Sequence, residues 1–127
     1  MKRIIYRIFD RYLRKKAIEN HRKMWRWLAE HSDKRKFEYL ELHDPEKEIY
    51  NNCYLCDYAR KKSKNETGIA FYFCWYCPLD WNGKDCTISD SLFDKWCKCG
   101  FENPGQIIKE RAEIARQIAE LPERKDR

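Results

Sequence analysis

The chain has 127 residues and a formal net charge of +6, with 38% charged and 15% aromatic residues. Its mean hydropathy is −0.95, and no apolar run approaches membrane-spanning length, which excludes a membrane-spanning protein. The aromatic content excludes a disordered chain, because large rings bury enough area to build a compact core. A single domain over residues 1–127 is therefore expected.

The charge is unevenly distributed along the sequence. Residues 1–36 carry 13 Lys and Arg against 4 Asp and Glu, a net +9, whereas the rest carries 14 against 17, a net −3. The sequence thus describes a basic segment joined to a slightly acidic body. We expect residues 1–16 to form a basic amphipathic extension.

Residues 2–31 predict a long helix, with a bend at 17–20 left open. Its apolar positions recur three and four residues apart, as on one helix face. They are Ile5, Ile8, Phe9, Tyr12, Leu13, Ala17, His21, Met24, Trp25 and Leu28. His21 lies on this face and is expected to be a hydrogen-bonded core imidazole. Ser32 or Asp33 is expected to cap a short second helix that ends at Asp44-Pro45, so that residues 17–44 are helical.

Residues 50–100 form a cysteine-rich segment. A short helix is predicted over 57–63, a turn over 65–68, and a short strand over 69–74, which is rich in aromatic and β-branched residues. Asn82-Gly83 is a turn signal. Ser89 or Ser91 should cap a short helix that carries Trp96 and stops at Gly100.

Residues 103–122 predict a second long helix. Asn103-Pro104 supplies a cap and a first-turn proline, and Pro122 ends the helix. We expect residues 123–127 to be a frayed tail. The predicted fold is mainly α, a small α+β protein in which two long terminal helices pack together and flank a zinc-knuckle module with a short strand or hairpin.

Two cysteine pairs share one spacing. Cys53-Tyr-Leu-Cys56 and Cys74-Trp-Tyr-Cys77-Pro form a C-x2-C…C-x2-C pattern, in which each pair can be presented by one tight turn. Two such turns complete a four-thiolate shell around Zn²⁺. The first-choice metal ligands are Cys53, Cys56, Cys74 and Cys77, and Cys86 is an alternative to Cys74. Ordinary buried thiols are the competing interpretation.

The remaining cysteines carry weaker signals. Cys97 and Cys99 lack an evident fourth ligand nearby, so we interpret them as buried or spectator thiols. Seven cysteines cannot all pair within one chain, which favours a reduced compartment, the cytoplasm.

Signals of catalysis are absent from the sequence. There is no Gly-rich phosphate loop, no His-Glu-x-x-His and no nucleophile signature with a plausible base. A four-thiolate shell has no open position for water, which points to a structural metal. No catalytic residues are predicted.

A set of motifs resembles a group of small bacteriophage-encoded cysteine-rich proteins. They are the Trp-containing segment 17–30, the two cysteine pairs with Pro78-Leu79, Cys86, and an aromatic residue followed by Asp-Lys-Trp96. The resemblance spans roughly residues 17–121. It implies a phage or mobile-element setting, and it implies that Cys86 belongs to the shared pattern.

These observations favour a non-enzymatic, zinc-stabilised interaction protein. It would bind, and by occlusion inhibit, a host protein or ribonucleoprotein such as a CRISPR or other defence effector. The alternative is nucleic-acid binding through the basic first helix. An anionic membrane surface is the least favoured partner of residues 2–16. The predicted partner-binding residues are Arg3, Arg7, Arg11, Arg14, Lys15, Arg22 and Arg26.

Overall fold

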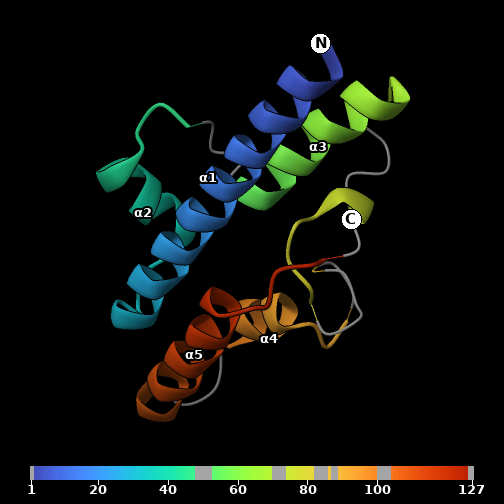
Figure 1. Cartoon of the computed structure of the whole chain (residues 1–127). Helices are drawn as coiled ribbons and strands as arrows, with labels where there is room; N and C mark the ends of the chain where they lie inside the picture. Colours follow the sequence, from blue (N-terminus) through green and yellow to red (C-terminus); the bar gives the residue numbers. More distant parts are fainter. Residues whose placement is uncertain are drawn as a thin grey trace.

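The computed structural model describes residues 2–47, 53–69, 74–81, 86, 89–99 and 104–125. Within these ranges the chain is mainly helical, as predicted (Figure 1). Its helices are α1 (Lys2–Glu30), α2 (Lys36–His43), α3 (Tyr54–Thr67), α4 (Leu92–Lys98) and α5 (Pro104–Ala119). None of these described helices combines the length and apolarity needed to cross a lipid bilayer.

In the described ranges the β-structure is limited to isolated bridges, one of which is antiparallel and joins Leu79 to Glu123. Most of the strand predicted over 69–74 and the Asn82-Gly83 turn lie outside the described residues. In the part of the chain that the structure describes, the β component of the predicted fold is therefore limited to isolated bridges.

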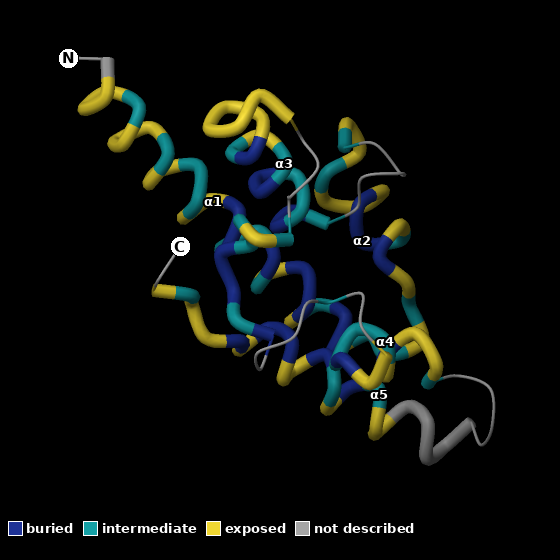
Figure 2. The backbone as a smooth tube through the Cα atoms, turned by 90° about the vertical axis from the view of Figure 1, so that its right-hand side faces the viewer, coloured by how far each residue is buried: buried dark blue, intermediate teal, exposed yellow. Residues whose placement is uncertain are grey.

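Helix α1 is the axis of the fold and runs without a break through residues 17–20. Its N-terminal half contacts α3, where Tyr58 Oη donates a hydrogen bond to Asp10 at 2.8 Å. Its C-terminal half packs on α5, so the two long helices lie together as predicted. Figure 2 shows burial concentrated in the second half of α1, beginning at Ala17.

An aromatic cluster fills the centre of the core. Trp25 is 1% exposed, and its ring meets Trp96 at 4.9 Å and Phe93 at 6.2 Å between centroids, both edge to face. Two cations lie over these rings: Lys36 Nζ is 4.2 Å from the Phe93 centroid, and the Arg111 guanidinium is 4.2 Å from that of Trp96. The cluster therefore joins α1, α4 and α5 and holds two cations by attraction to the ring faces.

Local capping explains where the short helices begin. Ser91 Oγ accepts a hydrogen bond from Asp94 N at 3.1 Å, which confirms one of the two predicted caps of α4. Helix α2 begins later than predicted: its cap is Arg35, whose backbone N–H donates to Glu38 Oε2 at 2.6 Å, and neither Ser32 nor Asp33 fills that role. The Glu38 carboxylate thus takes the place of the capping oxygen that was expected from Ser32 or Asp33.

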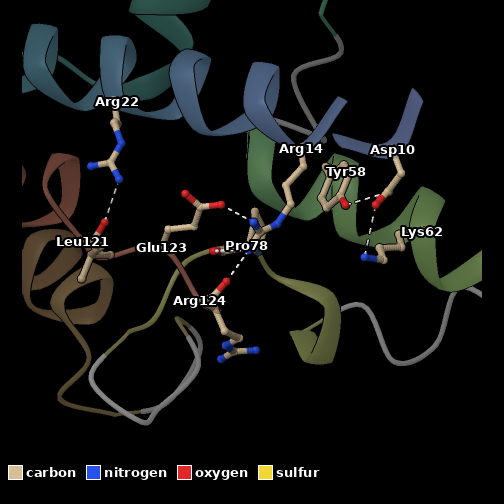
Figure 3. Close-up of polar contacts among 9 residues, drawn as sticks. All are labelled: Asp10, Arg14, Arg22, Tyr58, Lys62, Pro78, Leu121, Glu123 and Arg124. Carbon is tan, nitrogen blue, oxygen red and sulfur yellow. Dashed lines mark hydrogen bonds and ion pairs between the residues drawn. The ribbon is translucent and has the colours of Figure 1, made fainter. Parts of the chain in front are cut away.

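The C-terminal segment 122–125 is ordered against the rest of the molecule, so the prediction of a frayed tail from residue 123 is wrong for this stretch. Asp80 N donates to Pro122 O and Arg124 N donates to Pro78 O, each at 2.8 Å. Arg14 reaches the same place from α1, where it contacts Glu123 and the carbonyls of Arg124 and Pro78 (Figure 3). The segment loses its freedom because two regions, α1 and residues 78–80, satisfy its polar groups.

Arg14→Met is expected to lower the free energy of unfolding by about 1–3 kcal/mol, because it leaves the Glu123 carboxylate and two backbone carbonyls without a charged donor. Urea denaturation of the variant measures the loss. Arg11→Met is the matched control, since Arg11 is exposed on the same helix. Equal stabilities of the two variants would show that Arg14 does not hold the C-terminal segment.

His21 is a core imidazole, as predicted. It is 1% exposed, and its Nε2 donates to Ile118 O of α5 at 3.1 Å. Its Nδ1 has no hydrogen-bond partner among the described residues. Burial lowers the pKa of His21 from 6.5 to about 3, and nearby Lys36 and Arg22 add to this effect. The folded state therefore favours the neutral form of the ring.

The free energy of unfolding is expected to fall as the pH drops from 7 to 4. The unfolded chain gains a proton at His21 below pH 6.5 and the folded chain does not, which costs about 3 kcal/mol over this range. His21→Gln keeps a donor for Ile118 O but does not titrate, so its stability should depend less on pH. Urea denaturation of both proteins at several pH values measures the two slopes, and equal slopes would contradict the assignment.

Candidate metal centre

A small cavity lies between the first turns of α3, the segment 74–81 and Cys86. Its volume is about 10 Å³, room for about one water-sized sphere. Four cysteines line it together with Ala59, Trp81 and Arg124; they are Cys56, Cys74, Cys77 and Cys86. The fold thus gathers thiols from three separate stretches of sequence around one space.

Cys53 stands next to this cavity as the N-cap of α3. Its sulfur accepts a hydrogen bond from the backbone N–H of Cys56 at 3.4 Å. The predicted helix at 57–63 consequently begins earlier, at Tyr54, because the first cysteine of the pair caps it. The N-terminal end of a helix carries partial positive charge, which favours thiolate over thiol.

The second pair has a different local geometry. Residues 74–76 form a 3₁₀ turn, and the Cys77 backbone N–H donates to the Cys74 carbonyl at 3.2 Å. The Leu79 backbone N–H and the Trp81 side chain both lower the pKa of Cys77, although burial raises it overall. Two N–H groups from the residues that follow Cys77 therefore lie near its sulfur.

The thiols hold their protons in the absence of a cation. The Cys56 thiol and burial raise the pKa of Cys53 well above its usual value. In Cys56 the Cys53 thiol lowers the pKa, but the Cys86 thiol and burial raise it to about 12. A divalent cation would reverse this balance, because it binds the thiolate, so metal binding must release protons.

The cysteines that line the cavity have the chemistry of metal ligands, but the distances between their sulfurs do not match those of a metal site. No group of three or more His, Cys, Asp or Glu side chains in the described ranges already has metal-binding geometry. However, the buried indole Nε1 of Trp81, which lines the cavity, has no hydrogen-bond partner among the described residues. A metal-bound thiolate at Cys77 would be a stronger acceptor for it than a thiol.

The other two cysteines lie elsewhere. Cys97 is exposed on α4, and Cys99 follows that helix, with its sulfur 4.0 Å from Glu110 of α5. Neither lines the cavity, which accords with their interpretation as spectators.

The seven predicted partner-binding residues separate into two groups. Arg14 and Arg22 make intramolecular hydrogen bonds. Arg22 donates at the C-terminal end of α5, to the carbonyl of Ala119 at 2.7 Å and to that of Leu121 at 3.0 Å, the latter shown in Figure 3. The other five are exposed along α1; they are Arg3, Arg7, Arg11, Lys15 and Arg26. The first group serves the fold and the second is accessible to a partner.

The sequence reasoning missed an exposed apolar surface on the first half of α1. Residues expected on the core-facing stripe are more than half exposed: Ile5, Ile8, Phe9 and Tyr12, together with Ile4. The contact of this half with α3 runs instead through Asp10, with Tyr6 and Leu13 only half-buried. The sequence held a signal of this exposure: the apolar stripe of the first helix extends farther toward the N-terminus than a helix as short as α5 can cover.

Comparison with known proteins gives no assignment: no protein-family model, no curated protein and no solved structure matches the chain.

Proposed function

We propose that this protein is a non-enzymatic, zinc-stabilised interaction protein that binds a host macromolecule through the first half of α1. The observation that carries the proposal is the exposed surface of residues 3–15, where five large apolar side chains adjoin Arg3, Arg7, Arg11 and Lys15. The only acidic residue in this stretch, Asp10, is engaged by Tyr58 and Lys62.

The mixed character of this surface favours a protein or ribonucleoprotein partner. Ile4, Ile8 and Tyr12 are spaced four residues apart, the spacing by which a helix inserts anchors into an apolar groove. The adjoining arginines favour an acidic rim, because a guanidinium pairs with carboxylates in two hydrogen bonds. A protein that binds its partner through such a surface can act by occlusion and needs no catalytic group.

Zinc would supply the rigidity that such a surface requires. A structural zinc site contributes about 10–16 kcal/mol of apparent binding free energy in zinc-finger peptides, which exceeds what a small core provides. The phage setting and a defence effector as the target rest on the resemblance of residues 17–121 to small phage-encoded cysteine-rich proteins.

The second candidate is nucleic-acid binding through the same cations. It is favoured by the exposed Arg3, Arg7, Arg11, Lys15 and Arg26 along one helix. Such binding would weaken steeply between low and physiological salt, since it depends on counterion release. Retention of nucleic acid at physiological salt by the purified protein would favour this candidate over the first.

Replacing Arg3, Arg7 and Arg11 by Glu is expected to reduce recovery of the partner at least about tenfold, because like charges would face its acidic rim. The measurement is affinity purification from host lysate with nuclease treatment and quantitative mass spectrometry. The matched control replaces Lys64, Lys95 and Lys125, also exposed, by Glu, with the same change in net charge. Equal recovery by both variants would remove α1 from the interface.

A further inference from the structure

A groove runs between α1 and α3, which lie side by side (Figure 1). Its lining residues recur three or four positions apart, as on one helix face, from Tyr6 to Asn20 on α1 and from Tyr54 to Asn65 on α3. None of them lines the cavity formed by the cysteines. The groove is therefore a separate feature of the molecule.

The groove is long for its volume of about 210 Å³. Its ends are fourteen positions apart on α1 and eleven apart on α3, about 21 and 16 Å at a helical rise of 1.5 Å per residue. Small-molecule sites usually enclose about 300–1,000 Å³. A narrow groove of this length instead suits a row of side chains from a second helix.

One polar group of the groove has no partner. Tyr58 Oη donates to Asp10 at 2.8 Å, and Tyr54 Oη donates to Asp44 at 2.9 Å. Tyr6 Oη is buried and has no hydrogen-bond partner among the described residues. An unpaired buried hydroxyl destabilises the folded state, so an occupant that brings a hydrogen-bond acceptor would stabilise it.

Cations outnumber carboxylates in and beside the groove. Both carboxylates that line it already have lysine partners: Asp10 pairs with Lys62 at 3.4 Å, and Asp57 pairs with Lys47 and with Lys61, each at 3.6 Å. Lys16 also lines the groove, is exposed, and makes no ion pair with any described residue. Four lysines thus stand against two carboxylates, an excess of two positive charges that favours an anionic occupant.

The rim of the groove on α1 is apolar. Phe9 lines the groove, and Ile5 and Tyr12 lie one turn before and after it on the same side of the helix. All three side chains are more than half exposed. The groove is therefore continuous with the exposed apolar surface on which the proposed function relies.

From this groove we infer that the protein partner binds through an acidic amphipathic helix, which packs between α1 and α3 as a third helix. The inference rests on the proposed function and names the element that the partner presents. Apolar residues of that helix contact Phe9 and Leu13, and its carboxylates pair with Lys16 and Lys61 on the two rims. A nucleic acid fits less well, because its repeating phosphates would meet Asp10 as well as the lysines.

A labelled peptide tests the groove directly. It has about 18 residues, long enough to form a helix in isolation, with leucine at every third or fourth position and alternating glutamate and alanine elsewhere. Fluorescence anisotropy measures its affinity for the intact protein. Lys16→Glu combined with Lys61→Glu reverses one charge on each rim and should weaken binding at least about tenfold.

Lys15→Glu combined with Lys64→Glu is the matched control. These lysines are also exposed on α1 and α3 but do not line the groove, so the control has the same net charge and should bind the peptide more nearly as the wild type does. Equal affinities of the two double variants would overturn the groove as the binding site. That result would leave the proposed function standing, because the variant of Arg3, Arg7 and Arg11 tests it by recovery of the partner.

Two further arms test the chemistry of the occupant. Phe9→Asp should weaken peptide binding more than Ile4→Asp, since both side chains are exposed on α1 and only Phe9 lines the groove. Wild-type protein should prefer the acidic peptide to its lysine-for-glutamate counterpart and to an oligothymidylate of equal length. Absence of binding to the acidic peptide, or equal or tighter binding of either competitor, would overturn the acidic helix as the occupant.

Discussion

Cys77→Ser is expected to abolish the cooperative thermal unfolding of the protein. Cys77 belongs to both candidate ligand sets for the proposed zinc ion, and it precedes Pro78 and Leu79, which are buried and pair with the C-terminal segment 122–125. Loss of a structural zinc removes about 10–16 kcal/mol, as much as the net stability of a typical domain. Circular dichroism melts in zinc-containing buffer without chelator measure the effect.

Cys99→Ser is the control for this experiment, because Cys99 does not line the cavity. It should leave the melting temperature nearly unchanged. Treatment of the wild-type protein with a strong chelator should reproduce the Cys77→Ser result. If both serine variants and the chelated protein melt like the wild type, the cysteines do not hold a structural metal.

Trp25→Ala is expected to have the second large effect, a loss of about 3–5 kcal/mol in the free energy of unfolding. The ring is 1% exposed and contacts Trp96 and Phe93 of α4, and Lys36 Nζ lies 5.3 Å from its centroid. Its removal leaves a cavity and an under-compensated buried cation. Urea denaturation followed by far-ultraviolet circular dichroism measures the change.

Trp75→Ala is the matched control, since the Trp75 ring is 54% exposed. It should cost less than about 1 kcal/mol, as surface substitutions do. A similar loss in both variants would show that the aromatic cluster around Trp25 is not the centre of the core.

The sequence was sufficient for features that depend on neighbours in the chain. The spacing of Met24, Trp25 and Leu28 predicted the buried half of α1, Pro104 marked the start of α5, and Ser91 was one of two predicted caps for α4. Helix periodicity and capping act within one turn, so a single sequence contains the information.

Features that depend on distant segments could not be predicted. In the sequence, Arg14 and Arg22 cannot be told from the other cations of α1. They differ because residues 119–124 fold against them and accept their hydrogen bonds. Pairing of Leu79 with Glu123 involves a single bridge, which leaves no alternating pattern in either segment. The spacing of the cysteines likewise left Cys74 and Cys86 as alternatives, because spacing states nothing about which sulfurs converge.

The contact between His21 and Ile118 spans 97 residues of chain. During translation at about 5–20 residues per second, α1 therefore leaves the ribosome roughly 5–20 s before the helix that covers it has been made. Throughout that interval Met24, Trp25 and Leu28 are exposed to solvent on a nascent amphipathic helix. A holdase chaperone that shields this stripe, or slow synthesis that prolongs its exposure, should govern how much of the newly made protein reaches its native state.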